Sequence, residues 1–162
     1  MNDTDDAPER SGDRARLVGL NHVALEVGDV DEALEYYESL FEFDLRSRSE
    51  TNAFLDMGDQ FIALAETDAA GEEIDDARHF GLVVDDADRV AERLEDLEID
   101  RLDVPGLEFR DPWGNRFQIV DYEEIQFAKA DHVLEGMGFG GLEKTDGALE
   151  ELAEKGLASD SE

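Results

Sequence analysis

Two of the three histidines in this chain occupy equivalent positions in a repeated segment. The stretch HVALEVGDVDEALEYYESL, residues 22–40, aligns without a gap on HFGLVVDDADRVAERLEDL, residues 79–97, and places His22 on His79. Imidazoles are common ligands of divalent transition metals, whereas a lone histidine in a strand more often has a structural role. The match between the two histidines therefore favours a site for Fe, Mn, Ni, Co or Zn.

Gln118 is a polar residue among apolar neighbours near the end of the second repeat. A further match aligns FLDMGDQFIAL, residues 54–64, with FRDPWGNRFQI, residues 109–119, and places Gln118 opposite Ala63. A glutamine amide oxygen can bind a cation, but it is neutral and a weaker donor than a carboxylate. The alternative role for Gln118 is a half-buried amide that is hydrogen-bonded by its neighbours.

Regular patterns place these residues on the first and last strands of two similar units. The run NHVALEV alternates as a strand does, with His22, Ala24 and Glu26 on one face. Asp29 and Glu32 form a capping box at the start of a helix, and short strand-like runs follow. The second unit repeats this order from RHFGLVV to the turn DPWGN and a last strand. The pattern predicts an α+β fold.

The repeat also predicts how the chain is divided. The expected segments are a disordered acidic N-terminus at 1–16, a first βαβββ module at 17–66, an acidic linker at 67–77, a second βαβββ module at 78–122, and a C-terminal extension with a helix at 123–162.

The two units, each with an early histidine, and the DP-x-G-N turn before the last strand resemble the vicinal oxygen chelate superfamily. This superfamily includes glyoxalase I, extradiol dioxygenases, epimerases, fosfomycin-resistance thiol transferases and bleomycin-resistance proteins. The resemblance covers roughly residues 18–122. It implies that the two modules form an open, eight-stranded, barrel-like sheet around a pocket.

The resemblance further implies four pocket-facing metal positions, which alternate His or Gln, Glu, His, Glu. Position by position, these are His22, Ala63, His79 and Gln118 in this sequence. Both histidines match the superfamily pattern, and both carboxylates are absent. We therefore expect His22, His79 and Gln118 to be the metal ligands.

Other residues are candidates for the walls of the pocket. Glu26 shares a face with His22 and is a candidate catalytic carboxylate, although four residues along a strand correspond to about 13 Å. Asp56 and Glu108 are alternative carboxylates whose direction depends on strand register. An arginine in the pocket could pair with a carboxylate or phosphate, and the alternative is a surface ion pair. The candidate substrate-binding residues are Phe54, Phe61, Arg46, Arg48 and Arg110.

Two functions are compatible with these residues. The first is a divalent-metal-dependent lyase, isomerase or dioxygenase of glyoxalase type, acting on a small oxygen-rich metabolite. The second is a metal-free protein of the bleomycin-resistance kind, which binds a small ligand in the same pocket. The resemblance also implies a homodimer, in which the modules pair within one chain or across two.

The composition excludes other classes of partner. The chain has 45 Asp and Glu against 14 Lys and Arg, so its formal net charge is −31 and it lacks the basic surface that nucleic acids need. Such self-repulsion requires salt screening, which is typical of proteins from halophiles. The chain has no cysteine, no 18-residue apolar run and no signal-peptide pattern. We therefore expect a cytoplasmic, salt-dependent protein that does not bind membranes.

Overall fold

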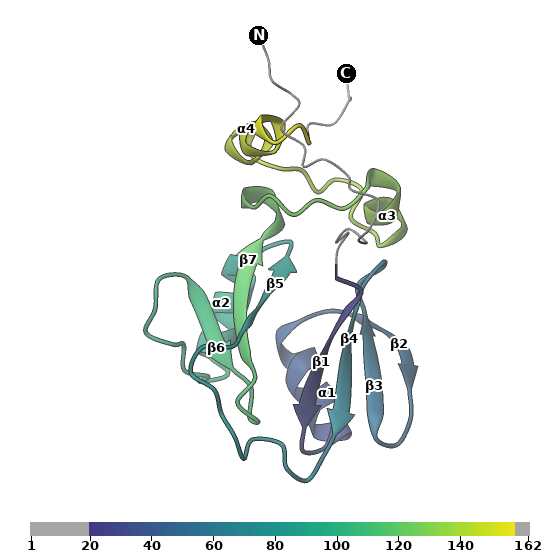
Figure 1. The fold of residues 1–162 in the computed structure, drawn as a ribbon, viewed down its shortest axis with the longest axis vertical. Coiled ribbons are helices and arrows are strands. Elements are labelled where there is room, and N and C mark those ends of the chain that lie inside the picture. The colour runs from purple at the N-terminus through teal and green to yellow at the C-terminus, as the bar shows by residue number, and fades with distance from the viewer. Residues whose placement is uncertain (1–19, 158–162) are drawn as a thin grey trace, which may run out of the picture.

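The structure, a computed structural model, describes residues 20–157 and contains two sheets, each with a helix on one face (Figure 1). The predicted N-terminal segment 1–16 lies outside the described residues. The first module consists of β1 (His22–Val27), α1 (Val30–Leu40), β2 (Asp44–Arg48), β3 (Asn52–Asp56) and β4 (Phe61–Glu66). The second consists of β5 (Phe80–Val84), α2 (Ala87–Asp96), β6 (Leu107–Arg110) and β7 (Arg116–Asp121).

The two sheets arrange their corresponding strands in the same order, and the first sheet has one strand more. The first has the order β1-β4-β3-β2 and the second the order β5-β7-β6, with β1 parallel to β4 and β5 parallel to β7. The predicted α+β fold with two related modules is confirmed. The expected eighth strand is reduced to one isolated bridge between Arg101 and Phe109. The described residues therefore form four strands in the first sheet and three in the second.

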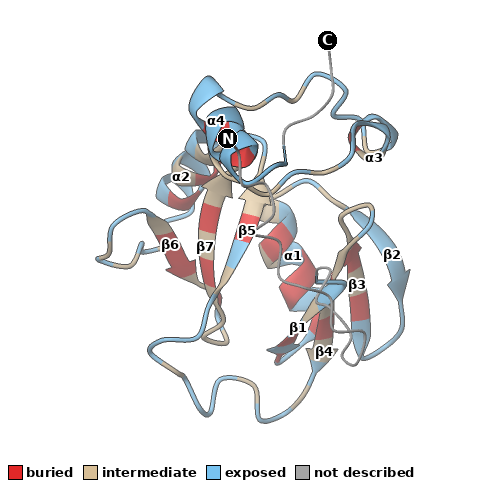
Figure 2. Ribbon diagram, turned by 45° about the horizontal axis from the view of Figure 1, so that its top comes forward, coloured by how far each residue is buried: buried red, intermediate tan, exposed pale blue. Residues whose placement is uncertain are grey.

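Each sheet buries one face against its helix and leaves the other face open (Figure 2). Leu25 and Val27 are buried, while His22, Ala24 and Glu26 are exposed, as the alternation predicts. The predicted cap of α1 is also confirmed, because the Asp29 side chain accepts a hydrogen bond from the Glu32 N–H at 2.9 Å. In the second module Asp86 has the corresponding position at the start of α2.

The turn between β6 and β7 is organised by the buried carboxylate of Asp111. This side chain, on a residue only 5% exposed, accepts hydrogen bonds from the backbone N–H groups of Trp113 and Asn115, each at 2.9 Å. It also accepts from the Asn115 amide at 2.8 Å. Gly114 adopts a φ of 84°, which a glycine tolerates without strain.

The same turn contacts the first module. The Asn115 side chain donates to the Glu26 carbonyl oxygen at 2.9 Å, and the indole of Trp113 lies against Gly28. The Tyr37 hydroxyl of α1 donates to Asp111. The end of β1 therefore lies beside the start of β7.

The C-terminal extension returns to the first module. It contains η1 (Tyr122–Glu124), α3 (Asp131–Gly136) and α4 (Asp146–Glu154). Lys129, whose side chain is 8% exposed, forms an ion pair with Asp59 in the β3–β4 turn, and the side chain of Met137 packs against Gly58. Among the described residues, no helix has the length and apolar character needed to cross a membrane.

Candidate metal and ligand site

The open face of the first sheet carries His22 within an aromatic group. The His22 ring stacks on Phe61, with ring centroids 4.7 Å apart and an interplanar angle of 11°. Phe54 lies 5.1 Å from Phe61. The Arg46 guanidinium lies 4.5 Å from the centre of the same ring and forms an ion pair with Asp56 at 2.9 Å. Three predicted ligand-binding residues, Arg46, Phe54 and Phe61, are therefore together near His22.

The open face of the second sheet carries Gln118. Gln118 pairs with Gly81 of β5 and with Glu108 of β6, so the three residues lie side by side. Gln118 is half-buried. Glu108 is only 6% exposed and forms an ion pair with Arg116 at 3.1 Å. A carboxylate is therefore the direct neighbour of the glutamine, although the superfamily's usual glutamate is absent.

His79 directly precedes β5, at the start of this open face. Its Nδ1 lies 2.9 Å from the Ala77 carbonyl oxygen. A carbonyl can only accept, so Nδ1 carries the proton and Nε2 of the neutral ring has the free lone pair. Ligand histidines are commonly oriented in this way.

His22 has a similar arrangement in the first module. Its Nδ1 lies 2.9 Å from the Asn21 side-chain oxygen, and in the neutral ring this contact again places the free lone pair on Nε2. Stacking on Phe61 restricts the ring as well. Both exposed histidines therefore present Nε2 as the potential ligand atom.

The structure does not bring the two histidines together within one chain. β1 and β5 run in opposite directions (Figure 1), so His22 and His79 lie at opposite ends of the two modules. The end of β1 at Glu26 contacts the turn near His79, whereas His22 lies four residues, or about 13 Å, back along the strand. Within residues 20–157, no three His, Asp or Glu side chains are grouped closely enough to hold a metal.

The remaining candidates occupy different places. Glu26 is exposed on the open face of the first sheet, at the far end of β1 from His22. Ala63 pairs with Ala24 and Phe54 on that face and offers no ligand atom. Arg48 forms an ion pair with Asp31 of α1, away from the aromatic group. Glu26 and Arg48 are therefore separated from His22.

Arg110 lies on the open face of the second sheet, directly opposite Arg116. Arg116 and Asp75 also contribute to this face, but neither was among the site residues predicted from the sequence. A signal for Arg116 was present in the sequence, because it lies two residues before Gln118 in an alternating strand. Asp75, in the linker, had no comparable signal.

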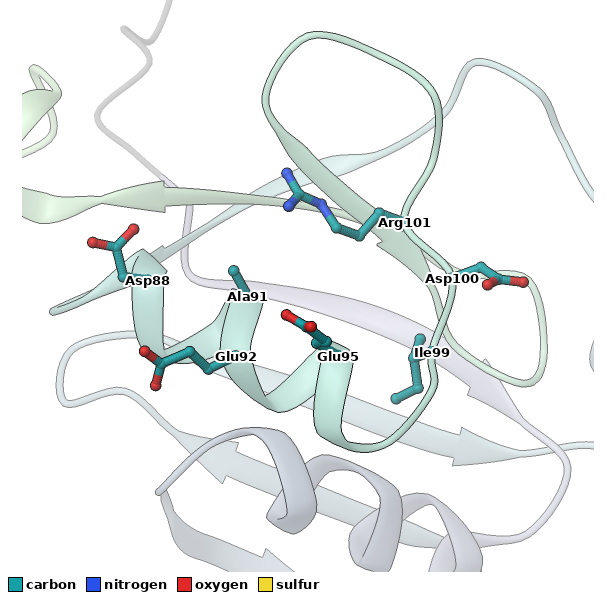
Figure 3. Close-up of a pocket in the computed structure, with 7 residues that line it drawn as sticks. All are labelled: Asp88, Ala91, Glu92, Glu95, Ile99, Asp100 and Arg101. Carbon is teal, nitrogen blue, oxygen red and sulfur yellow. The ribbon is translucent and has the colours of Figure 1, made fainter.

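A groove beside α2 lies apart from these residues (Figure 3). It is on the helix side of the second sheet, whereas Gln118 is on the open side. Its lining residues are Asp88, Ala91, Glu92, Glu95, Ile99, Asp100 and Arg101.

The sequence of this chain matches a known family over most of the two modules. The profile of the Glyoxalase/Bleomycin resistance protein/Dioxygenase superfamily matches residues 19–119, which is more than half of the chain. The chain therefore belongs to this superfamily.

Individual proteins are similar to this chain in sequence or in fold, at low sequence identity. The metallothiol transferase FosB of Bacillus licheniformis is 26% identical over 116 residues, covering 64% of this chain and 75% of that protein. Lactoylglutathione lyase from Agrobacterium tumefaciens is 22% identical with a TM-score of 0.53, over 66% of this chain and 96% of that one. The fosfomycin resistance protein FosX from Listeria monocytogenes, in complex with Mn(II) and sulfate, is 17% identical with a TM-score of 0.54. This match covers 75% of this chain and 99% of that one.

Proposed function

We propose that this protein is a divalent-metal-dependent enzyme of glyoxalase or dioxygenase type that acts on a small oxygen-rich metabolite. The observation that carries the proposal is the shared orientation of His22 and His79. Each ring has an oxygen atom 2.9 Å from Nδ1, so Nε2 is free to bind a metal. The complex of the Listeria relative with Mn(II) supports a metal in this fold.

We infer that the complete site is shared between two copies of the chain. His79 and Gln118 come from the second module of one copy, and His22 comes from the first module of the other. The opposite directions of β1 and β5 support this division, because they keep His22 and His79 of one chain apart, and a second copy could supply the missing histidine to each site. This arrangement requires a homodimer.

The residues of the chain would then have distinct roles. His22, His79 and the Gln118 amide oxygen would hold the metal, which when bound supplies a Lewis acid that polarises substrate oxygens. Phe54 and Phe61 would form an apolar wall. Glu108 would contribute negative charge next to Gln118, where the superfamily usually has a glutamate.

A metal-free ligand-binding protein is the second candidate. Two observations favour it: Gln118 and Ala63 occupy the usual carboxylate positions, and the Phe54–Phe61 pair provides a stacking surface without any metal. The difference between the two candidates lies in whether the histidines bind metal.

Metal analysis distinguishes the candidates. The protein is purified without chelator in high salt, loaded separately with Mn, Fe, Co, Ni or Zn, and compared with His79→Ala and with His132→Ala. His132 is exposed on α3 and serves as a matched control. We expect stoichiometric metal in the wild type and the control, and its loss in His79→Ala. Equal metal content in all three proteins, or none in the wild type, would contradict the enzyme.

A further inference from the structure

Two arginines lie side by side on the open face of the second sheet. Arg110 and Arg116 are direct partners across β6 and β7, so their side chains leave the sheet on the same face. Glu108 and Gln118 form the next pair on that face. Like charges at opposed positions repel each other, and this pair therefore needs nearby negative charge.

The chain supplies only part of that charge. Glu108 pairs with Arg116, but among residues 20–157 Arg110 has no carboxylate oxygen within 4.0 Å. The Arg110 guanidinium instead donates to the carbonyl oxygens of Gly114 at 2.8 Å and Asp75 at 2.9 Å. Of the two guanidiniums, only that of Arg116 is therefore paired with a carboxylate among the described residues, in a protein whose net charge is −31.

A donor on Arg116 is also unused. Its Nη1 donates to the Asp76 carbonyl oxygen at 2.7 Å and its Nη2 to Glu108, while Nε is buried and has no acceptor among the described residues. A buried N–H without an acceptor is costly. The described residues therefore leave one hydrogen-bonding group of Arg116 unused, at a nitrogen that is covered by its neighbours.

The linker fixes these groups next to His79. Three consecutive carbonyl oxygens, those of Asp75, Asp76 and Ala77, contact Arg110, Arg116 and His79 respectively. The Asp75 carboxylate holds this turn, because it accepts from the Ala77 N–H at 2.6 Å and the Arg78 N–H at 2.7 Å. The hydrogen bonds from Arg78 and Ala77 keep the pKa of Asp75 well below its usual range.

We infer that Arg110 and Arg116 bind an anionic group of the ligand, a carboxylate or a phosphate, beside Gln118. The planar guanidinium fork matches both oxyanions. The net charge of the whole protein repels an anion, whereas the two facing pairs Arg110–Arg116 and Glu108–Gln118 together carry one positive charge. The inference rests on the ligand site proposed above and names the chemical class of its ligand.

Titration calorimetry tests the inference on protein freed of metal by chelation and dialysis, at a fixed high KCl concentration. Inorganic phosphate and acetate are titrated separately, which distinguishes the two oxyanions. We expect at least one to bind, and Arg110→Gln to weaken its binding by about tenfold or more, since the substitution removes the charge that strengthens the hydrogen bonds to the anion. Arg89→Gln removes the same charge from an exposed position and should bind as the wild type does.

The inference is overturned if neither anion binds the wild type, or if the Arg110→Gln and Arg89→Gln proteins bind equally well. If circular dichroism shows that Arg110→Gln is unfolded, Arg110→Lys replaces it. Lysine keeps the charge but loses the planar fork, so weaker binding supports the inference and unchanged binding overturns it. Because no metal is present in the titration, its result does not depend on whether the proposed metal site exists. The two proposals can therefore fail separately.

Discussion

The buried carboxylate of Asp111 accepts hydrogen bonds from the turn that contains it and from Tyr37 of α1. Burial and the neighbouring Asp111 charge raise the pKa of Tyr36 to about 12. The pKa of Tyr37 is raised further, by burial first and then by the charge and hydrogen bond of Asp111. Both tyrosines therefore remain protonated in the folded protein at pH values where unfolded tyrosine ionises.

This difference predicts a loss of stability at high pH. The contribution of Tyr37 is fully present below pH 10.0, the ordinary pKa of tyrosine, and is lost as the pH rises above it. For Tyr37 the loss is about 1.4 kcal/mol per pH unit. Urea unfolding between about pH 8 and about pH 11 should show a steeper decline for the wild type than for Tyr37→Phe. If the free energy of unfolding declines equally with pH in the two proteins, the raised pKa of Tyr37 is contradicted.

Gly28 provides a second test at the residue scale. A Cβ at this position would lie 2.5 Å from the Trp113 indole nitrogen, so Gly28→Ala must displace the ring. We expect a loss of about 1–3 kcal/mol in the free energy of unfolding and a change in fluorescence, since Trp113 is the only tryptophan. Gly141→Ala, where a Cβ would meet no atom within 4 Å, is the control. Unchanged stability and emission would show that the turn does not pack on β1.

At the scale of elements, one lysine joins the C-terminal extension to the first module and another links two parts of the extension. Lys129 pairs with Asp59, and Lys144 donates to the carbonyl oxygens of Tyr122 at 2.5 Å and Ile125 at 2.9 Å. Burial lowers the pKa of Lys144. These are two of only three lysines in the chain, and both stabilise the path of the extension.

Lys129→Met should therefore loosen the extension without unfolding the modules. Methionine keeps most of the apolar packing but leaves Asp59 without its cation. We expect faster proteolytic cleavage within residues 123–157 and an almost unchanged circular dichroism spectrum. Lys155→Met, at an exposed position, is the control. Equal cleavage rates in the two variants would show that the ion pair with Asp59 does not hold the extension.

Most elements could be predicted from the sequence because their patterns are local. The alternation around His22, the cap at Asp29 and the DPWGN turn depend on neighbouring residues. The eighth strand expected near Arg101 is reduced to one bridge in the structure. Whether such a strand forms depends on its pairing register with the neighbouring strand, and register is not determined by local sequence. The contacts of Arg110 and Arg116 with the linker join residues about 35–40 positions apart, so periodicity could not predict them.

At the scale of the whole molecule, the charge of −31 predicts that folding depends on salt. Carboxylates repel one another across the surface, and screening weakens this repulsion as the ionic strength rises. We expect circular dichroism to show loss of helix and sheet on dialysis to low salt, and recovery when KCl is restored. A spectrum that is unaffected by desalting would contradict this prediction.

The equivalent positions of His22 and His79 in the two modules could be predicted from the repeat, but the placement of the two modules relative to each other could not. The repeat places His22 and His79 in equivalent positions in two modules, whereas the direction of β1 relative to β5 is a property of the complete fold. The proposed division of the site between two copies follows from that direction.

Mixing two single variants tests the shared site most directly. His22→Ala and His79→Ala are purified separately, combined under conditions that exchange subunits, and analysed for bound metal. Each variant alone should lack the site, while a mixed dimer contains one intact set of His22, His79 and Gln118. Recovery of metal, at one ion per mixed dimer, is the predicted result. Mixed dimers that form but bind no metal would contradict the proposal.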